Sequence, residues 1–455
     1  MSAGGIRALR ILTLAAAIAS IVSCTVGPDY VRPEANVPSA YKEAKDAPVA
    51  APGSVMPRAH WWDLYGDADL ASLEAQVLIN NQTVLAAEAR LRQAQAQIDV
   101  ARAPSFLGAN ASVTNEKVGV AASWEIDLWG RIRRSVEASS ATAQATADDL
   151  AAVTLEIQAQ IAQDYFLLRV QDAQIRLLQE SAARYERSLQ LTRNQYAVGV
   201  VSRGDVAQAE AQLMSTRAQA LEAEVDRAQF EHAIAILIGK APADFSIAAT
   251  TATQQVPAIP LALPSELLVR RPDIASAERR MAAANAQIGV AQAAFYPSAR
   301  LFAGGGIDIS FAGGIALAQF LLDGGLREAQ KAQASAAYDE TIANYRQTVL
   351  GALRDVEDNL SALRILESEA GVQGAAVKAS RESVTITNNQ YRAGTVTYLS
   401  VVVVQAAALV NERADLAILA RRLVASVNLI KALGGGWEAG VPTESANPPA
   451  TGTVK

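Results

Sequence analysis

Hydrophobic residues recur at seven-residue intervals along two long, alanine-rich stretches of the chain. The first series is Ile161, Leu168, Ile175, Ala182, Leu189 and Tyr196, and the second is Val356, Leu363, Ala370, Val377, Val384 and Tyr391. An apolar residue at every seventh position is typical of helices that pack along one face, as in a coiled coil. The pattern predicts long helices over 131–196 and 326–391, each of about 66 residues and therefore roughly 100 Å long.

The two stretches are copies of one another. The sequence NQYAVG at 194–199 returns as NQYRAG at 389–394, which is a shift of 195 residues (389 − 194). A glycine ends each copy and predicts a turn, after which return helices run over about 205–238 and up to the glycines at 434–436. We therefore expect two similar helical hairpins that pack against equivalent neighbours.

Each half also has an earlier predicted helix, over 73–103 and about 272–294. Between that helix and the long helix, the period of the pattern changes to two. Apolar side chains alternate with small or polar ones over 107–113, 118–127 and 298–310, which predicts β-hairpins at about 105–128 and 298–322. In the second hairpin, Ile315 and Leu317 fall on the face that we expect to be polar. Each strand has about 10 residues, the length of a tilted membrane strand. Two hairpins cannot close a barrel alone, since the smallest membrane barrels have eight strands. A soluble hairpin that caps the helices is the alternative.

The N-terminus reads as an export signal. Arg7 and Arg10 precede the apolar residues 11–22, a run too short to span a membrane, so residues 1–23 are predicted to be a signal peptide. The only cysteine, Cys24, follows and cannot form an internal disulfide. Its surroundings resemble a bacterial lipobox, in which Cys24 is lipidated and tethers the chain to a leaflet. Thr25 stands at the next position, in place of the Asp that commonly retains bacterial lipoproteins in the inner membrane, so we expect the outer membrane. A buried, inert thiol is the alternative.

Prolines mark the remaining borders. Six of them between positions 28 and 57 predict an extended segment over 24–60. We expect repeat 1 over 61–240, a proline-rich linker over 241–263, repeat 2 over 264–437 and a flexible tail over 438–455.

Composition and spacing argue against several kinds of function. The net charge is −6 and no Lys/Arg-rich run occurs, which argues against nucleic-acid binding. The two histidines, His60 and His232, lie far apart and flank no carboxylate cluster with metal-ligand spacing, and no phosphate-binding loop is present. We therefore expect no enzyme activity, no metal and no cofactor.

An ordered set of motifs resembles the TolC-like outer-membrane efflux proteins, in particular their OprM/NodT lipoprotein branch. The motifs lie at 24–30, 123–131, 270–274 with Glu278, 295–298, 322–325 and 431–437. The resemblance covers residues 24–437. It implies a homotrimer in which three protomers with four strands each form a transmembrane β-barrel and the helices form a periplasmic α-helical barrel. It also implies an exit duct for drugs or other small molecules, working with a periplasmic membrane-fusion adaptor and an inner-membrane pump of the RND type.

The resemblance also implies roles for particular residues. Those that contact the adaptor, tip to tip, are Val198, Gly199, Val200, Ala393, Gly394 and Thr395. Leu399 keeps the apolar position of the gate, whereas Val403 stands where family members often carry Asp. A ring of valines would gate by steric and dewetting effects. Asp205 is a second candidate for a ring at the gate, although a helix cap is its favoured role.

Two alternatives remain open within this reading. A type I secretion channel shares the family, but the lipobox and the motif at 24–30 favour small-molecule efflux. A lipid-anchored periplasmic coiled-coil scaffold would also have long helices, yet it has no need of strands with an apolar outer face. Both strand segments are shorter than is usual for the family.

Overall fold

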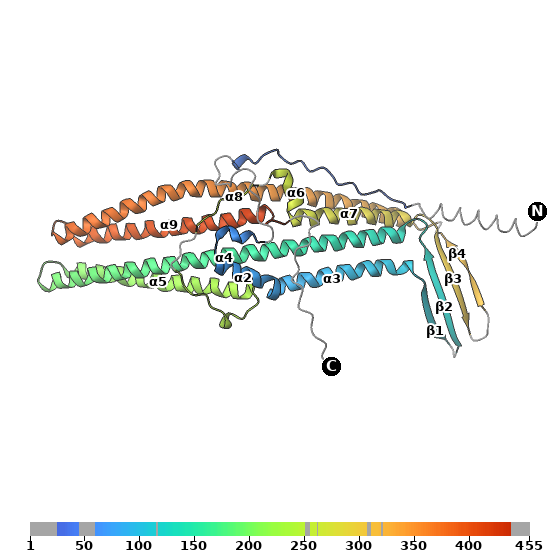
Figure 1. Ribbon diagram of the computed structural model, residues 1–455, viewed down its shortest axis with the longest axis horizontal. Coiled ribbons are helices and arrows are strands. Elements are labelled where there is room, and N and C mark those ends of the chain that lie inside the picture. Colours follow the sequence, from blue (N-terminus) through green and yellow to red (C-terminus); the bar gives the residue numbers. More distant parts are fainter. Residues whose placement is uncertain are drawn as a thin grey trace, which may run out of the picture. The chain divides into compact units, whose positions relative to one another are not determined.

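The computed structural model describes residues 25–44, 60–114, 117–250, 255–261, 263–306, 311–319 and 322–437. Its α-helices are α2 (Ala68–Asn80), α3 (Gln82–Arg102), α4 (Arg131–Ala197), α5 (Arg203–Leu237), α6 (Leu267–Arg270), α7 (Pro272–Ala293), α8 (Leu326–Arg392) and α9 (Tyr398–Ala432). Its strands are β1 (Gly108–Thr114), β2 (Lys117–Ile126), β3 (Ser298–Gly306) and β4 (Phe311–Ala318). Short 3₁₀ turns lie at Lys42–Ala44, Trp61–Tyr65, Ala103–Ser105, Pro242–Asp244 and Pro264–Glu266. The α-helices and strands are labelled in Figure 1.

The long helices follow the 195-residue repeat of the sequence. Helices α4 and α8 both have 67 residues, and α5 and α9 both have 35. Their starts and ends all differ by 195 residues (326 − 131, 392 − 197, 398 − 203 and 432 − 237). The helices expected from the seven-residue pattern are therefore confirmed, together with the turn in the middle of each hairpin.

The backbone packs as two compact units, each built from three stretches of chain. The first unit draws its described residues from Met1–Val37, Ala86–Ala152 and Pro272–Gly351. The second draws them from Pro38–Leu85, Val153–Arg271 and Ala352–Lys455.

The sheet of the first unit has two different faces. Its strands pair antiparallel in the order β1-β2-β3-β4 (Figure 1). The register places Val120 opposite Gly305, Trp124 opposite Leu301, and Leu301 opposite Ile315. This face is apolar although it is exposed: Val120 is 56% accessible and Ile315 is 66% accessible. The opposite face carries small and polar residues, with Phe302 as its one large apolar side chain among the described positions.

One expectation about this sheet was wrong. Ile315 and Leu317 do not lie on the polar face, because they pair with Leu301 and Ala299 and so join the apolar one. The reason is the length of the connections. The first hairpin pairs Thr114 with Lys117 across an even number of residues, whereas the second pairs Gly305 with Phe311 across an odd number. Positions 307 and 309, which we also expected in a strand, lie outside the described residues.

The N-terminal segment of the first unit is fastened to α4 by one arginine. Arg134 is only 4% exposed. Its guanidinium donates to the carbonyl oxygens of Val26 and Gly27, both at 3.3 Å, and to the Asp29 carboxylate at 2.9 Å. The amide of Val26 in turn donates to the Trp129 carbonyl oxygen at 3.1 Å.

In the second unit, polar contacts hold the short helices against the hairpins. A break at Asn81 separates α2 from α3. There the Asn81 side-chain oxygen accepts from the amides of Thr83 and Val84, and its nitrogen donates to the Leu237 carbonyl at 2.6 Å. Within the part of the chain described, no helix is both long enough and apolar enough to cross a membrane.

Candidate functional site

The two helical hairpins of the second unit end in turns of the same construction. We name them tip 1 (residues 198–202) and tip 2 (residues 393–397). In tip 1, Gly199 has φ 77° and its amide donates to the Tyr196 carbonyl, while the Val200 amide donates to the Gln195 carbonyl, both at 2.9 Å. Tip 2 repeats both bonds, with Gly394 at φ 74°. This pair of bonds is the Schellman motif, which favours glycine at the left-handed position.

The tips differ where the return helices begin. At tip 1, Ser202 and Asp205 form a capping box. The Asp205 carboxylate accepts from the Ser202 amide at 2.9 Å, and the Ser202 hydroxyl accepts from the Asp205 amide at 3.2 Å. At tip 2, Thr397 precedes α9 without a side-chain cap. The carboxylate of Asp205 is therefore committed to its own helix.

The outer surface of tip 1 is apolar and exposed. Val198 is 75% accessible and Val200 is 68% accessible. At tip 2, Ala393, Gly394 and Thr395 are exposed as well. These two valine side chains give tip 1 an exposed apolar surface.

The residues expected at the gate lie on one face of α9, just after tip 2. Leu399 is 52% exposed, Val403 58% and Val410 66%. They are four and seven residues apart, so they share one side of the helix. The opposite side, with Tyr398 and Val401, is buried. This exposed stripe carries no charge, and Asp205 belongs to the other hairpin.

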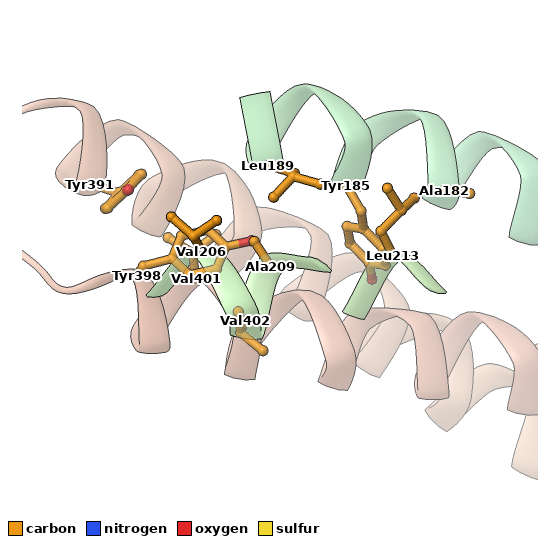
Figure 2. Packing of buried hydrophobic residues seen from close by; sticks show 10 residues of the cluster. All are labelled: Ala182, Tyr185, Leu189, Val206, Ala209, Leu213, Tyr391, Tyr398, Val401 and Val402. Atoms are coloured by element: carbon orange, nitrogen blue, oxygen red, sulfur yellow. The ribbon is translucent and has the colours of Figure 1, made fainter. Parts of the chain in front are cut away.

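Behind the tips, all four helices meet in one apolar cluster. Its members are Ala182, Tyr185, Leu189, Val206, Ala209, Leu213, Tyr391, Tyr398, Val401 and Val402. Figure 2 shows Tyr185 and Leu189 projecting from α4, with Val206 and Ala209 of α5 close to Tyr398 and Val401 of α9. The cluster fixes the two tips against each other.

Two tyrosine hydroxyls connect the hairpins across this cluster. Tyr391 of α8 donates to the side-chain oxygen of Gln195 on α4, and Tyr185 of α4 donates to the Gln405 carbonyl of α9 at 3.3 Å. Burial raises the pKa of Tyr185, so its hydroxyl keeps its proton. These bonds could not be predicted from the sequence. The one available signal was that Tyr196 and Tyr391 occupy the same position of the repeat, and only Tyr391 is buried: it is 6% exposed against 45% for Tyr196.

The described residues hold no group of three or more His, Cys, Asp or Glu side chains that could bind a metal ion. Cys24, the expected lipidation site, lies outside the described residues, as do the expected signal peptide and the tail after Trp437.

Comparison with known proteins decides the family. A family model described as "Outer membrane efflux protein" matches residues 73–240 and 263–435. The chain belongs to the outer membrane efflux protein family.

Individual members of the family match over nearly the whole chain. The toluene efflux pump outer membrane protein TtgC of Pseudomonas putida is 30% identical, covering 94% of this chain and 96% of its own length. The cation efflux system protein CusC of Escherichia coli is 27% identical, covering 94% and 99%. The solved structure of the outer-membrane channel OprN superposes with a TM-score of 0.84 at 27% identity, covering 91% of this chain and all of that one.

These matches confirm three expectations. The chain is an outer-membrane efflux channel protein, its place is the outer membrane, and its fold is mainly helical with a small antiparallel sheet. The matches come from channel components of efflux pumps.

Proposed function

We propose that three copies of this efflux protein assemble into one exit duct. The observation that carries the proposal is an exposed seam on α5. Met214, Leu221 and Val225 are 47%, 63% and 56% accessible, and with exposed Ala218 they are spaced by alternating steps of four and three residues. This is the spacing at which one helix packs into another, and none of the described helices covers these side chains.

The sheet supports the same assembly. Strands β1 and β4 each pair on one side only, so both edges of the sheet offer unpaired backbone groups. Joining β4 of one protomer to β1 of the next would satisfy both edges. Three protomers would then close a barrel of twelve strands, with the apolar face of Val120 and Ile315 turned to lipid. Lipidation of Cys24 would add a second attachment to the membrane.

The tips are the proposed docking points for a periplasmic membrane-fusion adaptor, which would connect the duct to an inner-membrane pump of the RND type. The exposed Val198 and Val200 support an apolar contact at tip 1. At tip 2, Ala393, Gly394 and Thr395 leave the backbone accessible, because their side chains are small.

The gate is proposed at Leu399 and Val403. Their exposed, uncharged stripe would restrict the passage by excluding water, rather than by binding cations. Asp205 has a different role in this proposal, since its carboxylate caps α5. The protein would supply a path and no chemistry, so we infer that it is not an enzyme and needs no cofactor.

Purification in mild detergent tests the proposal directly. A homotrimer that falls apart only on heating, and that opens discrete conductance steps in a planar lipid bilayer, is expected. A stable monomer without conductance would refute it. Replacing Leu221 by Glu on the α5 seam should prevent assembly. The matched change of Glu222, its exposed neighbour outside the seam, to Gln should leave assembly intact.

A further inference from the structure

A groove with an excess of positive charge lies behind the tips, within the second unit. It runs between α4 and α8, has α9 as its floor, and has a volume of about 490 Å³. Tyr185 and Tyr391, both visible in Figure 2, form part of its wall. We call it the arginine groove, because its charged lining consists of Arg184, Arg187, Arg381 and Arg392 with Glu412.

The single carboxylate of the groove is already neutralised. Glu412 accepts from Arg381 at 2.5 Å, and its side chain is only 10% exposed. Arg184 has a weaker local partner, since Glu180 lies 4.0 Å away on the same helix. The groove thus keeps an excess of cations in a chain whose net charge is −6.

Two of the arginines have no ion-pair partner among the described residues. Arg187 and Arg392 are exposed, and neither makes a hydrogen bond or ion pair with any residue that the structure describes. Guanidinium groups bind carboxylates through two parallel hydrogen bonds, which makes unpaired arginines in a concave surface effective recognition groups. The side-chain oxygen of Gln405, buried in the floor, also lacks a partner among the described residues.

The cations are distributed along the groove and do not converge on one point. Arg381 and Arg392 lie eleven residues apart on α8, which is about 16 Å along the helix. A small anion would contact one or two of them. A helix laid between α4 and α8 would pass all of them if it carried carboxylates on successive turns.

We propose that the arginine groove binds an acidic helix of the periplasmic partner. This inference rests on the proposal that the tips receive an adaptor, and it adds the chemistry of the partner: carboxylates spaced by three or four residues along one helical face. The contact would be electrostatic and separate from the apolar contact at Val198 and Val200. It would select among adaptors by charge and speed their approach.

Binding of synthetic helical peptides to the full-length protein in detergent tests the inference. The probe is an alanine-based helix labelled with a fluorophore, with Glu on successive turns of one face. Matched peptides carry Gln or Lys at the same positions. We expect the Glu peptide alone to bind, and its affinity to fall at least about tenfold as NaCl rises from about 50 to 500 mM.

The double variant Arg187→Gln/Arg392→Gln should weaken binding of the Glu peptide at least about fivefold, because two ion pairs are lost. Both side chains are exposed and have no partner among the described residues, so this variant should assemble normally. Arg203→Gln is the matched control, since Arg203 is also exposed and without a described partner but lies outside the groove. It should bind the peptide like the unchanged protein.

Three results would overturn the inference: equal binding of the Gln peptide, unchanged affinity in the double variant, or displacement of the peptide by phosphate at micromolar concentration. The last would indicate a small-anion site. The docking proposal is checked separately by crosslinking a purified adaptor to Val198→Cys. Crosslinking without peptide binding would refute the groove alone, and peptide binding without crosslinking would refute tip docking alone.

Discussion

Glu74 of α2 is a buried carboxyl group that has no hydrogen-bond partner among the described residues, and replacing it should stabilise the protein at neutral pH. Its side chain is 1% exposed, and neither carboxylate oxygen accepts a hydrogen bond from any described residue. Burial alone raises the pKa of Glu74 well above its usual value of 4.5. The group therefore favours the protonated, neutral form in the folded protein.

The sign of the pH dependence follows from the raised pKa. Below the unfolded value of 4.5, Glu74 is protonated in both states and costs no ionisation energy. Above it, the unfolded chain releases the proton while the folded protein keeps it. Each pH unit within that window then lowers the free energy of unfolding by about 1.4 kcal/mol, until the folded group ionises as well. Stability should thus fall as the pH rises above 4.5.

Glu74→Gln removes this dependence while keeping the shape of the side chain. Denaturant unfolding, followed by circular dichroism at pH 5 and pH 8, should show a smaller loss of stability at pH 8 in the variant. Glu74→Met should be more stable still at both pH values, because it also removes the unpaired polar atoms, which cost about 1–3 kcal/mol.

Glu278 of α7 is the matched control. It is 7% exposed, but it accepts from the Tyr30 hydroxyl at 2.7 Å and from the Arg279 guanidinium at 2.6 Å. Glu278→Gln should destabilise the protein by about 1.5–3 kcal/mol, since it weakens charge-assisted bonds. If Glu74→Gln destabilises the protein by a similar amount at pH 8, then Glu74 has a partner in the assembled protein and the reasoning fails.

Three further changes test the contacts described above. Arg134→Met should release the N-terminal segment at a cost of about 1–3 kcal/mol, seen as faster cleavage there under limited proteolysis, and an unchanged cleavage rate would contradict this. Tyr391→Phe removes the hydrogen bond to Gln195 across the hairpins, worth about 1 kcal/mol, and should raise the open fraction of single channels about fivefold. Val403→Ala should increase the conductance of the closed channel, and no change would place the gate elsewhere.

Much of the fold was readable from the sequence because its signals are local. A seven-residue apolar pattern in alanine-rich sequence specifies a long helix, and the glycines at 199 and 394 specify where it must turn. The contacts behind the tips were not readable. Tyr196 and Tyr391 are equivalent in the repeat, and only the packing of four helices makes one exposed and the other buried.

Part of the candidate site could likewise be predicted from the sequence, and part could not. The tips could be located, since their glycines are marked by the repeat. The arginine groove could not, because Arg187 and Arg392 lie on different helices, and each alone reads as a solvated charge. The burial of Glu74 could not be predicted either, because a glutamate within a helical pattern normally faces solvent.

The misassigned face of β4 shows how the repeat itself carries register. Strand β1 maps onto β3 with a shift of 190 residues (298 − 108), whereas the helices that follow shift by 195. The second hairpin is therefore five residues longer than the first. The extra residues belong to the connection between its two strands. The shift of 195 places Val120 on Ile315 and Ala122 on Leu317, so apolar even positions in β2 become apolar odd positions in β4. An odd number of extra residues changes whether even or odd positions face the apolar side of the sheet. The apolar face of β4 is kept because the longer connection shifts the register of this strand by the same odd number.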